Sequence, residues 1–155
     1  MDFLAELHPK VVHFPIALLL TYVIIELIGI VFRREFYQKA AHLLLFLGVI
    51  GAFFAVLTGN QAHTAYEYWS ESSSELFNEH QTFANLTVWY FTGMLVLRTY
   101  LVVKENFSSF YKYIILTLAL LGCYLIYQTA EYGGDLIKKF GVGTELNFNL
   151  TEPND

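Results

Sequence analysis

The sequence predicts an all-α fold, an integral membrane bundle of four transmembrane helices. Hydrophobic residues make up 55% of the 155 residues and charged residues only 15%. The apolar residues gather in four runs of roughly 20, and at about 1.5 Å per residue each run crosses a hydrocarbon layer about 30 Å thick. Within each run they lie on all sides of the helix, as expected where a helix faces both lipid and its neighbours. An even number of crossings places both termini on the same side of the membrane.

The first helix is expected over residues 11–32. It follows a segment rich in histidine and proline, His8-Pro9-Lys10-Val11-Val12-His13-Phe14-Pro15. Proline suits the first turn of a helix, so Pro9 can begin it. Pro15 lies one turn further in, where its missing N–H frees a backbone carbonyl and loosens the chain next to His13.

Glu26 lies deep in this first helix. A carboxylate at that depth must be paired, protonated or turned toward the bundle interior. We expect a hydrogen bond between helices, with Tyr22, Tyr124 or Tyr127 as the partner. A role in relaying protons is the alternative.

The second helix is expected over residues 40–59, and small residues recur along one of its faces. Gly48, Ala52, Ala55 and Gly59 are spaced four, three and four residues apart. Such a stripe lets another helix approach closely, and it would equally make room for a flat cofactor. His42, at the start of this helix, has no histidine partner at its level, so a second bis-histidine haem is not expected there.

Residues 62–80 are too polar to span a membrane and are expected to form an amphipathic helix on its surface. Its aromatic side would face the lipid. Its acidic side consists of glutamates at intervals of four, which form either a solvated face or a docking stripe for a basic partner: Glu67, Glu71, Glu75 and Glu79.

The third and fourth helices are expected over residues 82–103 and 111–129. The glycine-rich stretch 131–144 follows no strand and opens no helix, so it is not a phosphate-binding loop. We expect its glycines to form a tight turn that folds the chain back. The transmembrane domain is thus assigned to residues 1–144, and residues 145–155 form a polar C-terminal tail.

The distribution of Lys and Arg sets the expected orientation. Cytoplasmic loops carry an excess of these residues. Both termini are therefore expected on the periplasmic side of a bacterial inner membrane. The cations of the inner side are Arg33, Arg34, Lys39, Arg98, Lys104 and Lys112, against Lys10, Lys138 and Lys139 on the other.

Composition excludes several classes of function. The net charge of −5 and the absence of a basic patch are not those of a nucleic-acid-binding protein. A single cysteine, Cys123, excludes an internal disulfide, and the lack of a C-x-x-C-H motif excludes covalently attached c-type haem. No nucleophile lies beside a base and no catalytic carboxylate pair is evident, so hydrolase chemistry has no support.

Four of the five histidines fall at one end of the predicted bundle: His8, His13, His63 and His80. Neutral imidazole binds haem iron and also copper, zinc and non-haem iron. His13 and His80 adjoin spanning segments and are the expected axial ligands of a haem b, with His63 as the substitute and His8 nearer the surface. Alternatively, three or four of these side chains hold a bare metal ion.

The string His8 to Leu19, which reads HPKVVHFPIALL, resembles the opening of a family of bacterial four-helix membrane proteins known as domain of unknown function 2231. The likeness continues with Thr58-Gly59, with His80 and with the stretch from Gly133 to Gly143, and so covers the chain to about Thr144. The family itself is distantly similar to four-helix b-type dihaem cytochromes. That resemblance implies a respiratory or electron-transfer setting, with partners such as a c-type cytochrome.

Three functional hypotheses follow. The first is a small membrane b-type cytochrome, or the haem-bearing subunit of a respiratory complex, with its haem near the periplasmic face. The second is a cofactor-free accessory subunit that packs in a larger membrane complex. The third is a metal-binding or transport protein that uses the histidines for a bare ion.

Overall fold

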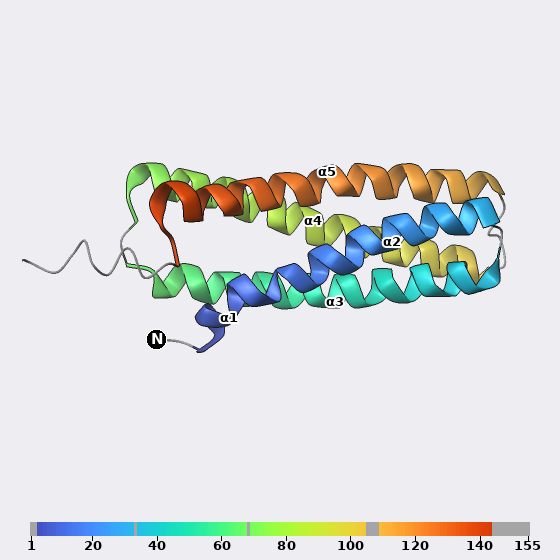
Figure 1. Ribbon diagram of the computed structural model, residues 1–155, viewed down its shortest axis with the longest axis horizontal. Coiled ribbons are helices and arrows are strands. Elements are labelled where there is room, and N and C mark those ends of the chain that lie inside the picture. The colour runs from blue at the N-terminus through green and yellow to red at the C-terminus, as the bar shows by residue number, and fades with distance from the viewer. Residues whose placement is uncertain (1–2, 33, 68, 105–108, 144–155) are drawn as a thin grey trace, which may run out of the picture.

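The computed structural model describes residues 3–32, 34–67, 69–104 and 109–143, and these are helical apart from short connections. Figure 1 shows a long bundle in which neighbouring helices run in opposite directions. Four helical rods are long and apolar enough to cross a membrane, the first made of two helices in succession. The all-α fold class and its four candidate spans are therefore confirmed. The helices are α1 (Phe3–Val11), α2 (His13–Phe32), α3 (Glu35–Ala65), α4 (Glu71–Val103) and α5 (Ser109–Phe140).

Three of the helices run well beyond their predicted apolar segments. Residues 62–80 do not form a separate helix: residues 62–65 continue α3, and residues 71–80 form the first turns of α4. The Ser70 hydroxyl accepts a hydrogen bond from the Ser73 N–H, and the Ser73 hydroxyl accepts one from the Ser70 N–H. This reciprocal pair is a capping box, and α4 begins there. The glutamate-rich stretch is thus the polar end of a long helix.

The glycine-rich stretch 131–144 also differs from expectation. Gly133 and Gly134 remain inside α5, and the turn comes only at Gly141 and Gly143. Both have a positive φ, 63° and 75°, which glycine adopts without a Cβ clash. Gly141 N–H donates to the carbonyl of Ile137 at 2.9 Å and so closes the last turn of the helix. The tail at 145–155 lies outside the described residues, as does Arg33.

The helices form a ring in which α2 packs on α3, α3 on α4, α4 on α5 and α5 on α2. Glycines permit the closest approaches: a Cβ on Gly48 would stand 2.6 Å from Leu19 Cδ2, and one on Gly122 would collide with the ring of Phe91. At Gly48, the small-residue stripe of α3 therefore allows close packing against α2. The core residues include Leu19, Leu45, Phe91, Met94 and Ala119.

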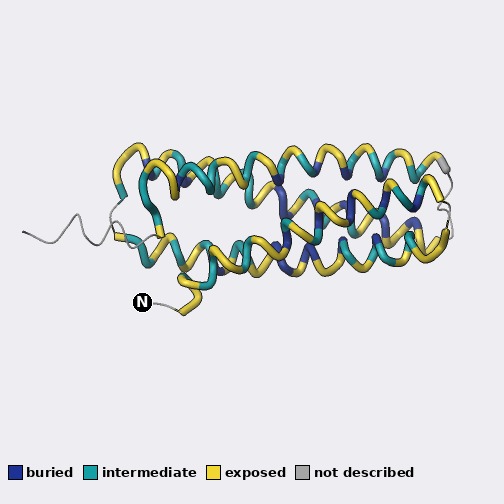
Figure 2. Tube along the Cα trace, viewed as in Figure 1, coloured by how far each residue is buried: buried dark blue, intermediate teal, exposed yellow. Residues whose placement is uncertain are grey.

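The bundle is closed in its middle and far half but open at the end that carries the N terminus, here called the N-terminal end. Figure 2 shows buried residues concentrated away from that end. The break at Val12, between the helix-interrupting Pro9 and Pro15, separates α1 from α2. In the part of the chain that the structure describes, α1 packs on α3 and α2 and makes no contact with α4 or α5.

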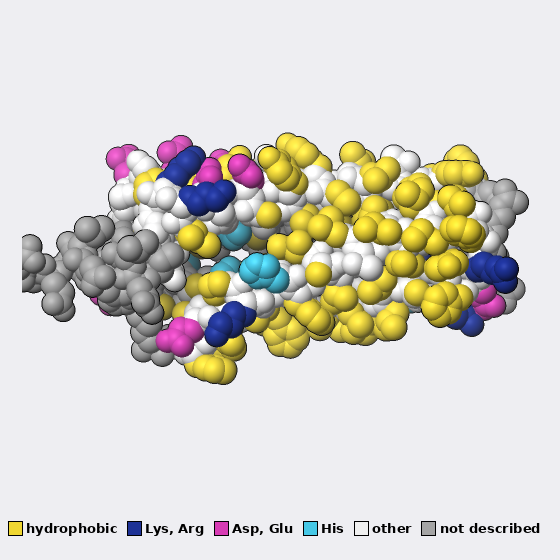
Figure 3. Space-filling view, viewed as in Figure 1, with side chains coloured by type: hydrophobic (Ala, Val, Ile, Leu, Met, Phe, Trp, Pro, Cys, Tyr) yellow, Lys and Arg dark blue, Asp and Glu magenta, His cyan; other side chains and the backbone are white. Residues whose placement is uncertain are grey.

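Most of the outer surface between the two ends is apolar (Figure 3). Large side chains such as Ile24, Leu57, Trp89 and Val96 are more than half exposed on it. A soluble domain would bury such a belt, whereas a bundle surrounded by hydrocarbon presents it to lipid.

Candidate functional site

His8 is held at the N-terminal end by two residues of α3. Its ring packs on Gly59, where an added Cβ would stand 2.9 Å from His8 Cε1. Its Nδ1 lies 3.1 Å from Thr58 Oγ1. The Thr58 hydroxyl directs its own hydrogen to the carbonyls of Phe54 and Ala55, both at 3.0 Å. Since that oxygen is already a donor to the backbone, it accepts from His8, which places the ring proton on Nδ1 and leaves the lone pair on Nε2.

His80 is held in the same way by α5. Its ring packs on Gly133, where an added Cβ would stand 3.0 Å from His80 Cε1. Its Nδ1 lies 3.0 Å from the backbone carbonyl of Thr129. A carbonyl only accepts, so Nδ1 again carries the proton and Nε2 the lone pair. Thr87 braces this contact, because its hydroxyl lies 3.1 Å from that of Thr129.

The two rings approach each other from opposite sides of the open end. His8 lies on the α1–α3 side and His80 on the α4–α5 side. The two rings are close enough that a positive charge on His80 would disfavour a positive charge on His8. Figure 3 shows histidine side chains gathered around a hollow there. Gln81 spans the α3–α4 side of this end by donating to Asn60 Oδ1 at 3.3 Å. Both rings are held through Nδ1, and His8 also has a hydrogen bond to the backbone of Ala55 in α3.

His13 and His63, chosen from the sequence as ligand and substitute, lie elsewhere. His13 is exposed, and its Nδ1 donates to the carbonyl of Pro9, four residues earlier in the last turn of α1, at 2.7 Å. The exposed ring of His63 stacks on Phe77 at a centroid distance of 4.0 Å and contacts Trp69 at 4.9 Å. The structure brings His80 together with His8, the residue judged superficial from the sequence. Gly59 of α3 and Gly133 of α5 lie beside the two rings, and these glycines are the sequence feature from which the His8–His80 pair could have been predicted.

The described residues contain no group of three or more His, Cys, Asp or Glu side chains that could hold a metal ion together. A bare ion ordinarily takes three or four protein ligands. The His8–His80 pair supplies two, which is the number of axial positions on a haem iron.

A second polar cluster lies deep in the far half of the bundle. Glu26 Oε2 of α2 pairs with Arg98 Nη1 of α4 at 2.6 Å, and both side chains are fully buried. Arg98 also donates to the backbone carbonyl of Gln38 at 3.0 Å and lies 6.0 Å from the centre of the Tyr22 ring. Arg98 is thus the partner of Glu26, in place of the tyrosine hydrogen bond expected from the sequence.

The glutamate row stays at the surface. Glu67 lies in the connection between α3 and α4, and Glu71, Glu75 and Glu79 follow along the first turns of α4, all exposed. None of the four makes a salt bridge within the described residues. The row is a solvated face in the isolated chain and leaves its charges available to a partner.

Fold and site together define a class, a four-helix membrane bundle with a pair of histidines from opposite sides at its N-terminal end. The chain belongs to the family described as predicted membrane protein DUF2231, whose model matches residues 5–146. That match spans both histidines and the glycines beneath them. No curated protein and no solved structure matches the chain.

Proposed function

We propose that this protein is a small b-type cytochrome of the membrane, or the haem-bearing subunit of an electron-transfer complex, with His8 and His80 as axial ligands of one haem. The observation that carries the proposal is the matched environment of the two rings. Each has Nδ1 bonded to the protein and a glycine beneath it. A histidine bound to a metal needs that arrangement, because the Nδ1 bond fixes both ring and tautomer.

The surroundings of the rings also suit a flat, largely apolar ligand. A side chain at position 59 or 133 would push against the imidazole, whereas glycine leaves each ring flush with its neighbouring helix. A bound haem would supply reversible one-electron transfer, and the protein's part is to hold the two imidazoles and shield them from water.

The charge distribution supports a periplasmic position for this site in a bacterial inner membrane. The loops at the far end carry Arg34, Lys39, Lys104 and Lys112, and such residues favour the cytoplasmic side. A redox centre at the N-terminal end then lies within reach of periplasmic electron carriers, such as a c-type cytochrome. The exposed glutamates at that end suit a carrier with a basic surface.

The test is the absorption spectrum of detergent-purified protein made in cells supplied with haem, recorded after air oxidation and after dithionite reduction. The proposal predicts a Soret band that sharpens on reduction, with separate α and β bands, at one haem per chain. A featureless spectrum from folded protein would overturn it and leave the cofactor-free accessory subunit. Bound copper or zinc without porphyrin would overturn it in favour of the bare-ion alternative.

A further inference from the structure

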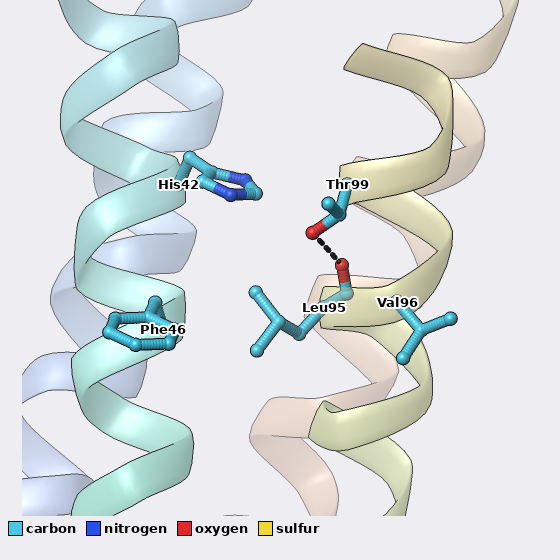
Figure 4. Close-up of a pocket in the computed structure, with 5 residues that line it drawn as sticks. All are labelled: His42, Phe46, Leu95, Val96 and Thr99. Atoms are coloured by element: carbon cyan, nitrogen blue, oxygen red, sulfur yellow. Dashed lines mark hydrogen bonds between the residues drawn. The ribbon is translucent and has the colours of Figure 1, made fainter. Parts of the chain in front are cut away.

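A groove separates α3 from α4 in the far half of the bundle. It has a volume of about 450 Å³ and is lined by His42 and Phe46 of α3 and by Leu95, Val96 and Thr99 of α4. Figure 4 shows the His42 ring pointing across the gap toward Thr99, above the apolar side chains. Phe46 is 47% exposed and Val96 64% exposed, so the groove opens onto the apolar belt. A ligand would therefore enter the groove from the lipid bilayer.

The groove has one polar end, at His42 and Thr99. His42 Nδ1 is buried without a hydrogen-bond partner in the described residues. The Thr99 hydroxyl gives its hydrogen to the carbonyl of Leu95 at 2.7 Å and keeps its lone pairs. A buried donor left without an acceptor costs about 1–3 kcal/mol, so a ligand that supplies an acceptor oxygen is favoured.

The groove presents no net charge to its occupant. The nearest ionised groups, Arg98 and Glu26, are paired with each other and are 0% exposed. A phospholipid headgroup would need charged partners that the lining does not offer. His42 also lies seven residues into α3, about 10 Å below the start of the helix, which is deep for a phosphate.

We propose that this groove binds a membrane-dissolved isoprenoid quinone, with a carbonyl oxygen of its head at His42 and its tail leaving along Phe46 and Val96. A neutral ring with carbonyl acceptors matches the uncharged polar end, and the aromatic face of Phe46 suits a flat head. The cavity falls within the range of about 300–1,000 Å³ usual for small-molecule sites. Seventeen residues, or about 25 Å, separate His42 from Gly59 along α3, so this site is distinct from the His8–His80 pair.

The experiment measures binding of a photoreactive short-chain benzoquinone to the purified chain in quinone-free phosphatidylcholine nanodiscs. Mass spectrometry then locates the label. We expect saturable labelling of the peptides around His42 and Val96, displaced by unlabelled quinone. His42→Leu should weaken binding about three- to tenfold, the loss of one hydrogen bond, and Thr99→Phe should abolish it by filling the groove.

Two further variants keep the outcome decisive. His42→Gln retains a donor and should bind within about threefold of the wild type, which separates the hydrogen bond from a folding defect. His13→Leu makes the same kind of change at an exposed site outside the groove and should bind as the wild type does. Labelling that does not saturate, that anionic phospholipid displaces as well as quinone does, or that His42→Leu leaves unchanged would overturn the proposal. Because the readout is binding, it does not depend on haem.

Discussion

The two ends of the bundle place polar groups inside a membrane protein in opposite ways. In the far half, Glu26 and Arg98 satisfy each other within closed packing, 2.6 Å apart and shielded from both water and lipid. At the N-terminal end, His8 and His80 are each bonded to the protein through Nδ1 and pack on a glycine of the neighbouring helix. Polar groups in a membrane mark either internal bracing or a functional site. The Glu26–Arg98 pair is bracing, whereas the histidine pair is the site that we propose for a haem.

The glycines of the two regions pack against different kinds of side chain. Gly48 and Gly122 admit a neighbouring apolar side chain and tighten the core, whereas Gly59 and Gly133 admit an imidazole. The same residue type therefore serves helix packing in one region and histidine positioning in the other.

Arg98→Met should have the largest effect, because it leaves the Glu26 carboxylate buried without its cation. Breaking a buried pair in this way costs about 3–5 kcal/mol. We expect a large fall in the thermal unfolding midpoint in detergent. The double variant Glu26→Gln, Arg98→Met should recover most of that loss, since it removes both charges. A single variant as stable as the wild type would show that the pair does not brace the bundle.

Gly133→Val and Gly59→Val should each destabilise the N-terminal end by about 1–3 kcal/mol through overpacking against a histidine ring. The displaced ring should also lose haem. Both effects are measured on one sample, by thermal unfolding and by haem content. Gly93→Ala is the matched control, because a Cβ there would meet nothing within 4 Å. Equal haem content in the control and in both valine variants would contradict the role given to these glycines.

Thr58→Val should have a smaller effect, since it keeps the side-chain shape and removes the acceptor of His8 Nδ1–H together with the hydroxyl's own bond to the α3 backbone. One hydrogen bond is worth about 0.5–1.5 kcal/mol, which corresponds to haem affinity about two- to tenfold weaker. Haem transfer to an acceptor protein measures that affinity. Thr64→Val removes a comparable hydroxyl that is bonded only within α3, to Asn60 at 3.0 Å, and should leave the affinity unchanged.

Replacing Glu71, Glu75 and Glu79 together by glutamine should change stability least. These side chains are exposed and repel one another at intervals of four, so their removal is worth a few tenths of a kcal/mol in favour of the helix. The thermal midpoint should stay the same or rise slightly, and the haem content should not change. A fall comparable to that of Arg98→Met would mean that the row has a structural role.

The sequence was sufficient for the four spans, because uninterrupted apolar runs of membrane length admit few other folds. It was insufficient where a polar segment joined a helix, as at 71–80, since local polarity does not reveal that α4 continues past the apolar region. It predicted His13 and His80 as a pair, whereas the structure places His8 with His80 at the N-terminal end and leaves His13 exposed. Which ring turns inward depends on the break at Val12 and on the packing of α1 against α3, and neither can be read from spacing along the chain.

The most direct test of the account is the haem content and reduced spectrum of three single variants, His8→Ala, His80→Ala and His13→Ala, purified in parallel with the wild type. The account predicts that His8→Ala and His80→Ala each lose the low-spin spectrum while retaining the helical fold by circular dichroism. His13→Ala should keep the spectrum and one haem per chain. Loss of the spectrum in His13→Ala with retention in His8→Ala would contradict the assignment of the site.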